Sequence, residues 1–125
     1  KTVALLGLTF KPDTDDMRDA PSLSIISGLQ DGGAKVVAYD PEGIEQAKPM
    51  LQGVSYAEDA YACATGADVL VLVTEWRQFR ALDLPRLKEL MNAPVLVDLR
   101  NVYSPAEAEK HGFQYTGIGT TKVDA

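Results

Sequence analysis

The sequence predicts an α/β protein with a doubly wound, mainly parallel sheet of about five or six strands in the order 3-2-1-4-5-6 and helices on both faces. Apolar runs of strand length alternate along the chain with segments of helical periodicity. The runs at 2–8 and 68–74 are almost continuously hydrophobic, as is typical of strands buried on both faces of a sheet. Right-handed crossovers between such strands give a Rossmann-like arrangement.

The expected strands and helices follow from these patterns in order. Strand patterns cover residues 2–8, 34–41, 54–56, 68–74, 93–100 and 113–119. Helical patterns cover residues 21–33, 42–51, 57–66, 75–92 in one or two pieces, and 104–112. Asp19 is the expected cap of the first helix and Gly32 its expected end. Asp83 and Ser104 are the expected caps of the last two helices.

Composition limits the possible functions. The 125 residues fit one domain, expected over 1–119, with a disordered tail at 120–125. A net charge of -6 argues against a general nucleic-acid binder. No apolar run approaches the roughly 18 residues of a membrane helix, and one Cys excludes a disulfide framework, so we expect a cytoplasmic protein. The chain starts on a strand without a Met, so we expect a fragment of a longer protein.

Basic residues gather in the loops that would face a ligand. In a doubly wound sheet, ligands bind beyond the carboxyl ends of the strands, where the strand order reverses. The loops expected there carry five of the 12 basic residues: Lys11, Arg18, Arg77, Arg80 and Arg100. Arg and Lys bind phosphate through charge-assisted hydrogen bonds, so a phosphorylated small molecule is the expected ligand.

The first strand lacks the usual phosphate-binding signatures. Only Gly7 stands where a G-x-G-x-x-G turn would be, and Thr9 and Phe10 follow it. A pyrophosphate turn over the first strand is therefore not expected, and the P-loop pattern is absent as well. Asp40 ends the second strand, as a ribose-binding acid would, but without the glycines a turn or cap is the favoured interpretation.

Several other residues have a functional and a structural interpretation. A cluster of acids in the first loop could hold a metal ion, but it lacks calcium-loop spacing, and capping or turn roles are favoured; its members are Asp13, Asp15, Asp16 and Asp19. Trp76 and Phe79 are spaced to share a helix face, which predicts packing, although Trp76 could also line a pocket rim. His111 lies at a helix end and is not expected to be catalytic.

Three segments carry a family resemblance. "GLTFKPDTDDMRDAPS", "VTEWRQFRALD" and "VLVDLRNVY" resemble, in this order, loops of the C-terminal, UDP-sugar-binding domain of the UDP-glucose/GDP-mannose 6-dehydrogenases. The resemblance covers about residues 1 to 119. Within the family, "TEW" and "DLRN" are most similar to the UDP-glucose 6-dehydrogenases, which implies oxidation of UDP-glucose to UDP-glucuronate with NAD as cofactor.

The resemblance also implies roles for particular residues. Phe10 and Lys11 resemble the pair that contacts the UDP-sugar, Arg100 resembles another substrate-contacting residue, and Arg18 resembles the Arg that reaches NAD across a domain gap. The family's nucleotide-binding Rossmann domain, its catalytic Cys and its dimer contact belong to other segments. Cys63 does not match that nucleophile and has no His or Lys beside it in the sequence to lower its pKa.

Alternatives remain open at this stage. The same domain of a GDP-mannose or UDP-N-acetylmannosamine dehydrogenase would share the motifs. A receiver-type signalling domain shares the sheet and has an acidic pair near its first strand, but it needs a further Asp on the central strand and a Lys at the end of a late strand. Here Asp15 and Asp16 come well after the first strand, and the late strand ends in Arg100. A nucleotide-binding module without an enzymatic parent would share the basic loops.

Overall fold

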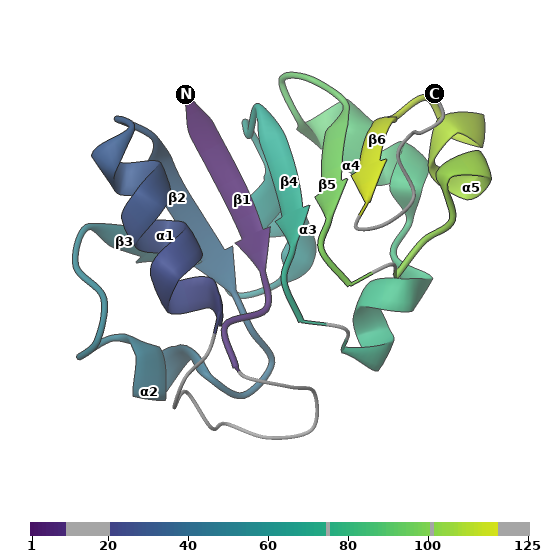
Figure 1. The fold of residues 1–125 in the computed structure, drawn as a ribbon. Coiled ribbons are helices and arrows are strands. Elements are labelled where there is room, and N and C mark those ends of the chain that lie inside the picture. The colour runs from purple at the N-terminus through teal and green to yellow at the C-terminus, as the bar shows by residue number, and fades with distance from the viewer. Residues whose placement is uncertain (10–20, 75, 101, 118–125) are drawn as a thin grey trace.

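The computed structural model describes residues 1–9, 21–74, 76–100 and 102–117. Within these ranges the chain forms a six-stranded sheet in the order β3-β2-β1-β4-β5-β6, and every pairing is parallel. The strands are β1 (Thr2–Leu6), β2 (Lys35–Tyr39), β3 (Val54–Tyr56), β4 (Val69–Leu72), β5 (Val95–Asp98) and β6 (Gln114–Gly117). The predicted fold class and strand order are confirmed (Figure 1).

Helices connect the strands at the predicted places but are shorter than the patterns suggested. They are α1 (Pro21–Asp31), α2 (Ile44–Ala47), α3 (Ala60–Ala64), the 3-10 helix η1 (Arg77–Ala81), α4 (Leu84–Leu90) and α5 (Pro105–Lys110). None of the helices in the described ranges is long and apolar enough to cross a membrane. The expected tail at 120–125 lies outside the described residues.

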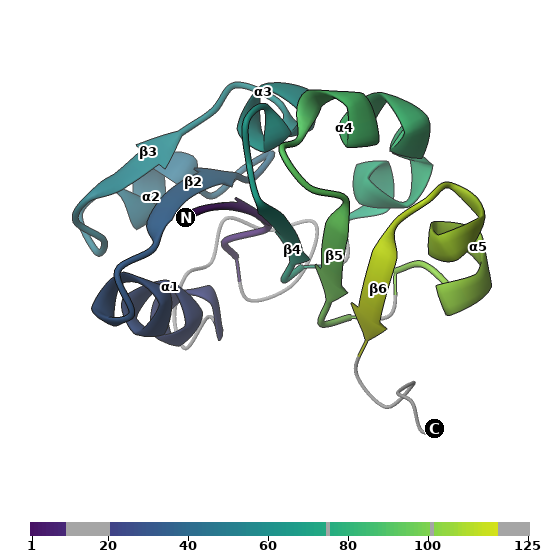
Figure 2. The same ribbon diagram turned by 90° about the horizontal axis from the view of Figure 1, so that it is seen from above.

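The near-continuous apolar strands are explained by a core on each side of the sheet. Along β1, Val3 and Leu5 pack into one buried cluster, whereas Ala4 and Leu6 pack into the other. The first cluster includes Ile26 of α1, and the second includes residues of α3, α4 and α5. Figure 2 shows α1 on one side of the sheet and α3 and α4 on the other. Both faces of the central strands are therefore buried.

Two predicted helix caps are confirmed, the predicted glycine is displaced, and Asp19 lies outside the described residues. The side chains of Asp83 and Ser104 accept hydrogen bonds from the backbone N–H groups of Arg86 and Glu107 and so cap α4 and α5. The predicted end of the first helix at Gly32 is wrong by one residue. Gly33 has the left-handed backbone, with φ of 89°, and the flanking hydrogen bonds form a Schellman motif that needs a glycine there.

Gly7 lets β1 and β4 approach each other at the sheet's carboxyl edge. Its φ is 102°, a conformation that residues with a side chain rarely adopt. A Cβ atom at this position would lie 2.5 Å from the backbone nitrogen of Thr74 and 2.6 Å from its Cβ. A glycine is therefore required after the first strand because Thr74 packs directly against it. Thr74 occupies the space next to the Gly7 backbone.

This contact predicts opposite effects of two Gly→Ala substitutions. Gly7→Ala should lower the free energy of unfolding by about 2–4 kcal/mol, because it adds both backbone strain and a backbone clash. Gly28→Ala should raise it by about 0.5–1 kcal/mol, because Gly28 lies inside α1 with nothing within 4 Å of the added methyl group. Urea unfolding followed by circular dichroism measures both. Equal stability of Gly7→Ala and the wild type would contradict the proposed close approach.

Candidate functional site

The candidate site lies at the carboxyl edge of the sheet, next to the point where the strand order reverses between β1 and β4. In Figure 1 this is the lower edge, where the arrowheads end. The loops that follow β1, β2, β4 and β5 leave the sheet there. Two buried carboxylates, Asp40 after β2 and Asp98 at the end of β5, organise the described parts of these loops.

Asp40 collects hydrogen bonds from three loops. Its Oδ2 accepts from the backbone N–H groups of Leu8 (2.7 Å) and Thr9 (3.1 Å), from the Thr9 hydroxyl (3.3 Å) and from the Trp76 indole (3.1 Å). Its Oδ1 accepts from the N–H groups of Glu42 (2.8 Å) and Gly43 (2.7 Å). The predicted turn role is confirmed by this second pair, and the first set adds ties to the loops after β1 and β4.

Two hydroxyl groups hold the described residues on either side of the range 10–20. Thr9 is fully buried and forms the start of the loop. Its carbonyl oxygen accepts a hydrogen bond from the Thr74 hydroxyl at 2.8 Å. At the other end, the Ser22 hydroxyl in the first turn of α1 donates to the carbonyl oxygen of Leu8 at 2.6 Å. The described residues on the two sides of the range 10–20 are therefore joined by a hydrogen bond between Ser22 and Leu8, and Thr9 is joined to Thr74.

Asp98 orders the loop after β5 in a similar way. Its carboxylate accepts from the backbone N–H groups of Arg100 (3.1 Å) and Tyr103 (2.8 Å). The Tyr115 hydroxyl lies 2.9 Å from the Asp98 carboxylate and 2.7 Å from the carbonyl oxygen of Tyr103, so its single proton can serve one of these acceptors at a time. Burial and the hydrogen bond to Asp98 raise the pKa of Tyr115, which keeps this proton in place.

Tyr103 connects this loop to η1. Its hydroxyl donates to the carbonyl oxygen of Phe79 at 2.5 Å and accepts from the N–H group of Leu82 at 3.1 Å. Burial raises the pKa of Tyr103 to about 12, so the hydroxyl stays a donor at neutral pH. Phe79 is fully buried, and its ring meets that of Tyr39 edge to face with centroids 6.2 Å apart. The predicted packing role of this aromatic residue is confirmed.

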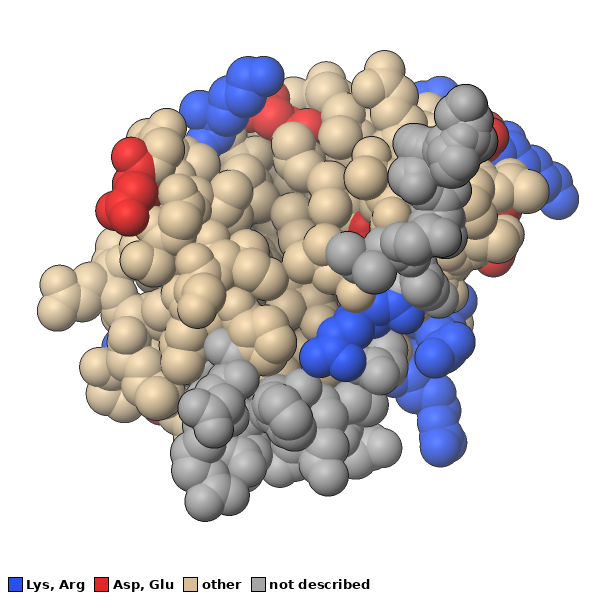
Figure 3. All heavy atoms as spheres, viewed as in Figure 1, with Lys and Arg blue, Asp and Glu red and all other residues tan. Residues whose placement is uncertain are grey.

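Basic side chains gather beside these loops. Figure 3 shows Lys and Arg atoms in blue at the edge of the sheet where β4 and β5 end. The basic residues of the described loops there are Arg77 and Arg80 on η1, both exposed, and Arg100, which is partly buried. A 3-10 helix repeats every three residues, so Arg77 and Arg80 lie on one side of η1. This edge can attract an anion.

The other predicted site residues are not described by the structure. Phe10, Lys11 and Arg18 lie outside the described residues. The acids of the proposed metal cluster, from Asp13 to Asp19, fall in the same range. Among the residues that the structure does describe, no group of three or more His, Cys, Asp or Glu side chains could hold a metal ion.

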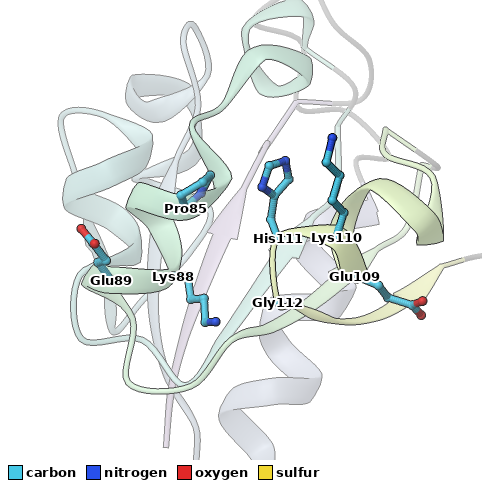
Figure 4. A pocket seen from close by; sticks show the side chains of 7 residues that line it. All are labelled: Pro85, Lys88, Glu89, Glu109, Lys110, His111 and Gly112. Atoms are coloured by element: carbon cyan, nitrogen blue, oxygen red, sulfur yellow. The ribbon is translucent and has the colours of Figure 1, made fainter.

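A hollow lies away from this edge, between α4 and α5. It has a volume of about 540 Å³, and it is lined by Pro85, Lys88, Glu89, Glu109, Lys110, His111 and Gly112. Figure 4 shows Lys88 reaching toward Gly112, whereas the two glutamates point in different directions. His111 is the C-cap residue of α5, as its predicted structural role requires. The lining side chains do not converge on a common point in this hollow.

Cys63 is buried in this fold. It lies in α3 with 1% of its surface exposed, and its sulfur faces the carbonyl oxygens of Val37 (3.3 Å) and Leu5 (3.8 Å). Burial raises the pKa of the thiol to about 12, so the reactive thiolate is suppressed at neutral pH.

The first turn does not fit the pyrophosphate of NAD. Thr74 occupies the space above Gly7, where a glycine-rich turn would let a dinucleotide approach the backbone. Asp40 has the position of a ribose-binding acid, but it is 1% exposed and already accepts six hydrogen bonds. The described residues therefore define a doubly wound α/β domain with a basic carboxyl edge and no dinucleotide turn of its own.

Comparisons with known proteins agree with this class. The model of the UDP-glucose/GDP-mannose dehydrogenase family, UDP binding domain, matches residues 4–105. The chain belongs to this family and corresponds to its UDP-binding domain. The alternative of a receiver-type signalling domain is thereby excluded.

Individual relatives carry more specific names. The chain is 56% identical over 117 residues to a UDP-glucose 6-dehydrogenase of Rhizobium meliloti and 46% identical over 129 residues to one of Pseudomonas aeruginosa. These matches cover 94% and 98% of this chain but only 27% and 28% of the relatives, so the chain spans little more than a quarter of their length.

Solved structures share the fold across most of the chain. An NDP-N-acetyl-D-galactosaminuronic acid dehydrogenase from Methanosarcina mazei superposes with a TM-score of 0.82 at 30% identity, over 94% of this chain and 24% of that one. A UDP-glucose dehydrogenase from Pyrobaculum islandicum gives a TM-score of 0.74 at 30% identity, over 93% and 24%.

Four residues of the site were missed by the sequence interpretation: Thr74, Asp98, Tyr103 and Tyr115. One signal was available for Asp98, because it ends an apolar strand just as Asp40 does. The other three depend on contacts between loops that are distant in the sequence, and no local pattern marks them.

Two buried groups predict a loss of stability at alkaline pH. Burial raises the folded-state pKa of Cys63 from 9.0 and of Tyr103 from 10.0, each to about 12. The unfolded chain therefore releases these protons first as the pH rises. The stabilisation that is complete below pH 9 should be lost progressively up to about pH 12, by a few kcal/mol in order of magnitude.

Urea unfolding at a series of pH values between 8 and 12 measures this dependence. Cys63→Ala should flatten the decline from about pH 9 upward, and Tyr103→Phe from about pH 10 upward. Because both variants keep all the Lys residues, their comparison with the wild type isolates the two buried groups. An unchanged slope in both variants would refute the assignment.

Proposed function

We propose that the chain is the UDP-sugar-binding domain, over residues 1–119, of an NAD-dependent UDP-glucose 6-dehydrogenase that makes UDP-glucuronate. The observation that carries the proposal is the 56% identity over 94% of the chain to a relative of that name, in a chain that belongs to the UDP-binding domain family. The geometry supports it, because a basic carboxyl edge beside the point of strand reversal suits a diphosphate.

The substrate contacts are assigned to Phe10, Lys11 and Arg100. Phe10 and Lys11 directly follow Thr9, whose backbone is fixed at the carboxyl edge by Asp40. Arg100 follows β5 at the same edge, and its backbone is fixed by Asp98. The three residues occur in the segments that resemble the family's substrate loops, and both segments leave the same edge of one parallel sheet.

The cofactor contact is assigned to Arg18, with NAD held mainly by a separate domain. The first turn of this chain does not fit a dinucleotide, since Thr74 fills the space above Gly7. A chain that spans little more than a quarter of its relatives leaves ample length for a cofactor domain and a catalytic Cys in a longer protein. The buried Cys63 supports the assignment of the nucleophile to another segment.

The proposal extends to the location and the oligomeric state of the parent enzyme. A cytoplasmic enzyme is consistent with a single free, buried Cys, which needs no oxidising compartment. The parent enzyme is proposed to be a homodimer or a higher oligomer, on the resemblance to the family alone.

A related sugar nucleotide is the second candidate substrate. The structure with a TM-score of 0.82 is an NDP-N-acetyl-D-galactosaminuronic acid dehydrogenase, so an N-acetylated hexosamine nucleotide deserves a direct comparison. GDP-mannose is the third, because the family name includes it.

Ligand titration tests the proposed substrate and its contacts. Binding of UDP, UDP-glucose, UDP-N-acetylmannosamine and GDP-mannose to the ¹⁵N-labelled chain can be followed by NMR, which detects millimolar affinity. UDP-glucose should bind in preference to GDP-mannose. Lys11→Ala and Arg100→Ala should each weaken binding about tenfold or more, because each removes a charge-assisted hydrogen bond.

Two further variants sharpen this titration. Lys35→Ala is the matched control, because Lys35 is exposed at the opposite, amino end of β2. Arg18→Ala should leave UDP binding by this chain near the wild-type value, since its assigned partner is NAD. Preference for GDP-mannose, or wild-type binding by both Lys11→Ala and Arg100→Ala, would overturn the substrate assignment.

The chain by itself should not oxidise UDP-glucose. Its one thiol is buried with a pKa of about 12, and its first turn does not fit NAD. Mixing the chain with UDP-glucose and NAD⁺ should therefore give no absorbance at 340 nm from NADH above a protein-free blank. NADH formation by the 125-residue chain alone would show that the catalytic Cys and the NAD site are wrongly assigned to other segments.

A further inference from the structure

We infer that Asp40 is a positioning residue for the ligand site: its buried carboxylate ties Thr9, the last described residue after β1, to Trp76, which immediately precedes η1. This inference rests on the proposed function, because it presumes that the loop after β1 contacts the ligand. It adds a residue that does not itself touch the ligand.

The first step is the proximity of Asp40 to the start of the loop. Thr9 immediately precedes Phe10, and both its backbone N–H group and its hydroxyl donate to Oδ2 of Asp40. The neighbouring N–H group of Leu8 donates to the same oxygen at 2.7 Å. Because two successive peptide groups point at one buried acceptor, Asp40 sets the orientation of the backbone at Leu8 and Thr9.

The second step is that the loop after β4 shares this acceptor. The indole N–H group of Trp76 donates to the same Oδ2 at 3.1 Å, and the ring is only 6% exposed. η1, with its exposed Arg77 and Arg80, begins at the next residue. A displacement of Asp40 would therefore change the exit of the first loop and the base of η1 together.

The third step is that Asp40 cannot act by contact with the ligand. It is 1% exposed, and its other oxygen accepts from the N–H groups of Glu42 and Gly43. Gly43 also packs closely, because a Cβ there would lie 2.6 Å from Cγ2 of Thr9. With protein donors on both oxygens and almost no exposed surface, Asp40 can influence the ligand only through the two loops.

Asparagine at this position tests the inference with almost no change of shape. All six donors point at oxygen atoms, whereas an asparagine side chain has one oxygen and one NH₂ group, so one set of donors loses its acceptor. In Asp40→Asn we expect UDP to bind about tenfold more weakly or worse, and the indole N–H resonance of Trp76 to shift. Trp76 is the only Trp in the chain, so its indole signal is unambiguous.

The control separates positioning from a general loss of stability. Met91→Ala removes a buried side chain at the C-terminal end of α4, at the opposite edge of the sheet. Both Met91→Ala and Asp40→Asn should lower the urea midpoint. Met91→Ala should nevertheless bind UDP with wild-type affinity and leave the indole resonance of Trp76 unshifted.

The outcomes distinguish this inference from the proposed function. If the wild-type chain gives no saturable shifts with UDP, the proposed function fails. If the wild type binds UDP and Asp40→Asn binds it equally well, the proposed function stands and the positioning role is refuted.

A milder variant decides the question if Asp40→Asn does not fold. Trp76→Phe keeps a buried aromatic ring but removes one donor from Oδ2. It should shift the amide resonances of Leu8 and Thr9 and weaken UDP binding by about threefold to fivefold, since the shared acceptor is no longer held from the β4 side. Wild-type amide shifts and wild-type affinity in Trp76→Phe would refute the coupling between the two loops.

Discussion

The carboxylate of Asp40 is the constraint on which the carboxyl edge depends. It lies at the end of β2, next to β1, and accepts hydrogen bonds from the loops after β1, β2 and β4. Burial of a carboxylate lowers the stability of the fold unless its oxygen atoms accept hydrogen bonds. The loss of a single donor therefore already destabilises the folded state. The three loops are therefore held in one mutual arrangement, because any other would leave the charge without its donors.

The same principle extends along the edge to β6. Asp98 orders the loop after β5, Tyr103 of that loop holds η1, and the Tyr115 hydroxyl of β6 lies against Asp98. Buried polar groups that satisfy one another make a rigid edge. A nucleotide-binding domain without a glycine-rich turn needs such rigidity, because side chains rather than the backbone must then hold the ligand in position.

This arrangement also shows why a glycine after β1 and an acid after β2 do not by themselves make a dinucleotide site. The fold still has a glycine after β1 and an acid after β2. Here the glycine accommodates Thr74 instead of a pyrophosphate, and the acid faces inward to the protein's own N–H groups. Both positions have the residue types of a dinucleotide site but contact the protein itself, which is why a motif match alone would misjudge them.

The sequence alone determined the layers, the strand order and the caps of α4 and α5, since these depend on hydrophobic periodicity and on caps within a few residues of each other. It also identified the turn role of Asp40 and the family. The end of α1 was misplaced between two adjacent glycines, because only the backbone geometry shows that Gly33 is left-handed.

Only the tertiary structure decided which residues organise the edge. Thr74, Tyr103 and Tyr115 act on partners 65, 24 and 17 residues away in the sequence, and the Trp76 indole reaches Asp40 across 36 residues. Local patterns carry no record of such pairs, because the hydrogen bonds exist only once parallel strands bring the loops together. The sequence determined which strands meet, whereas the buried donors and acceptors at their ends are matched only in the folded chain.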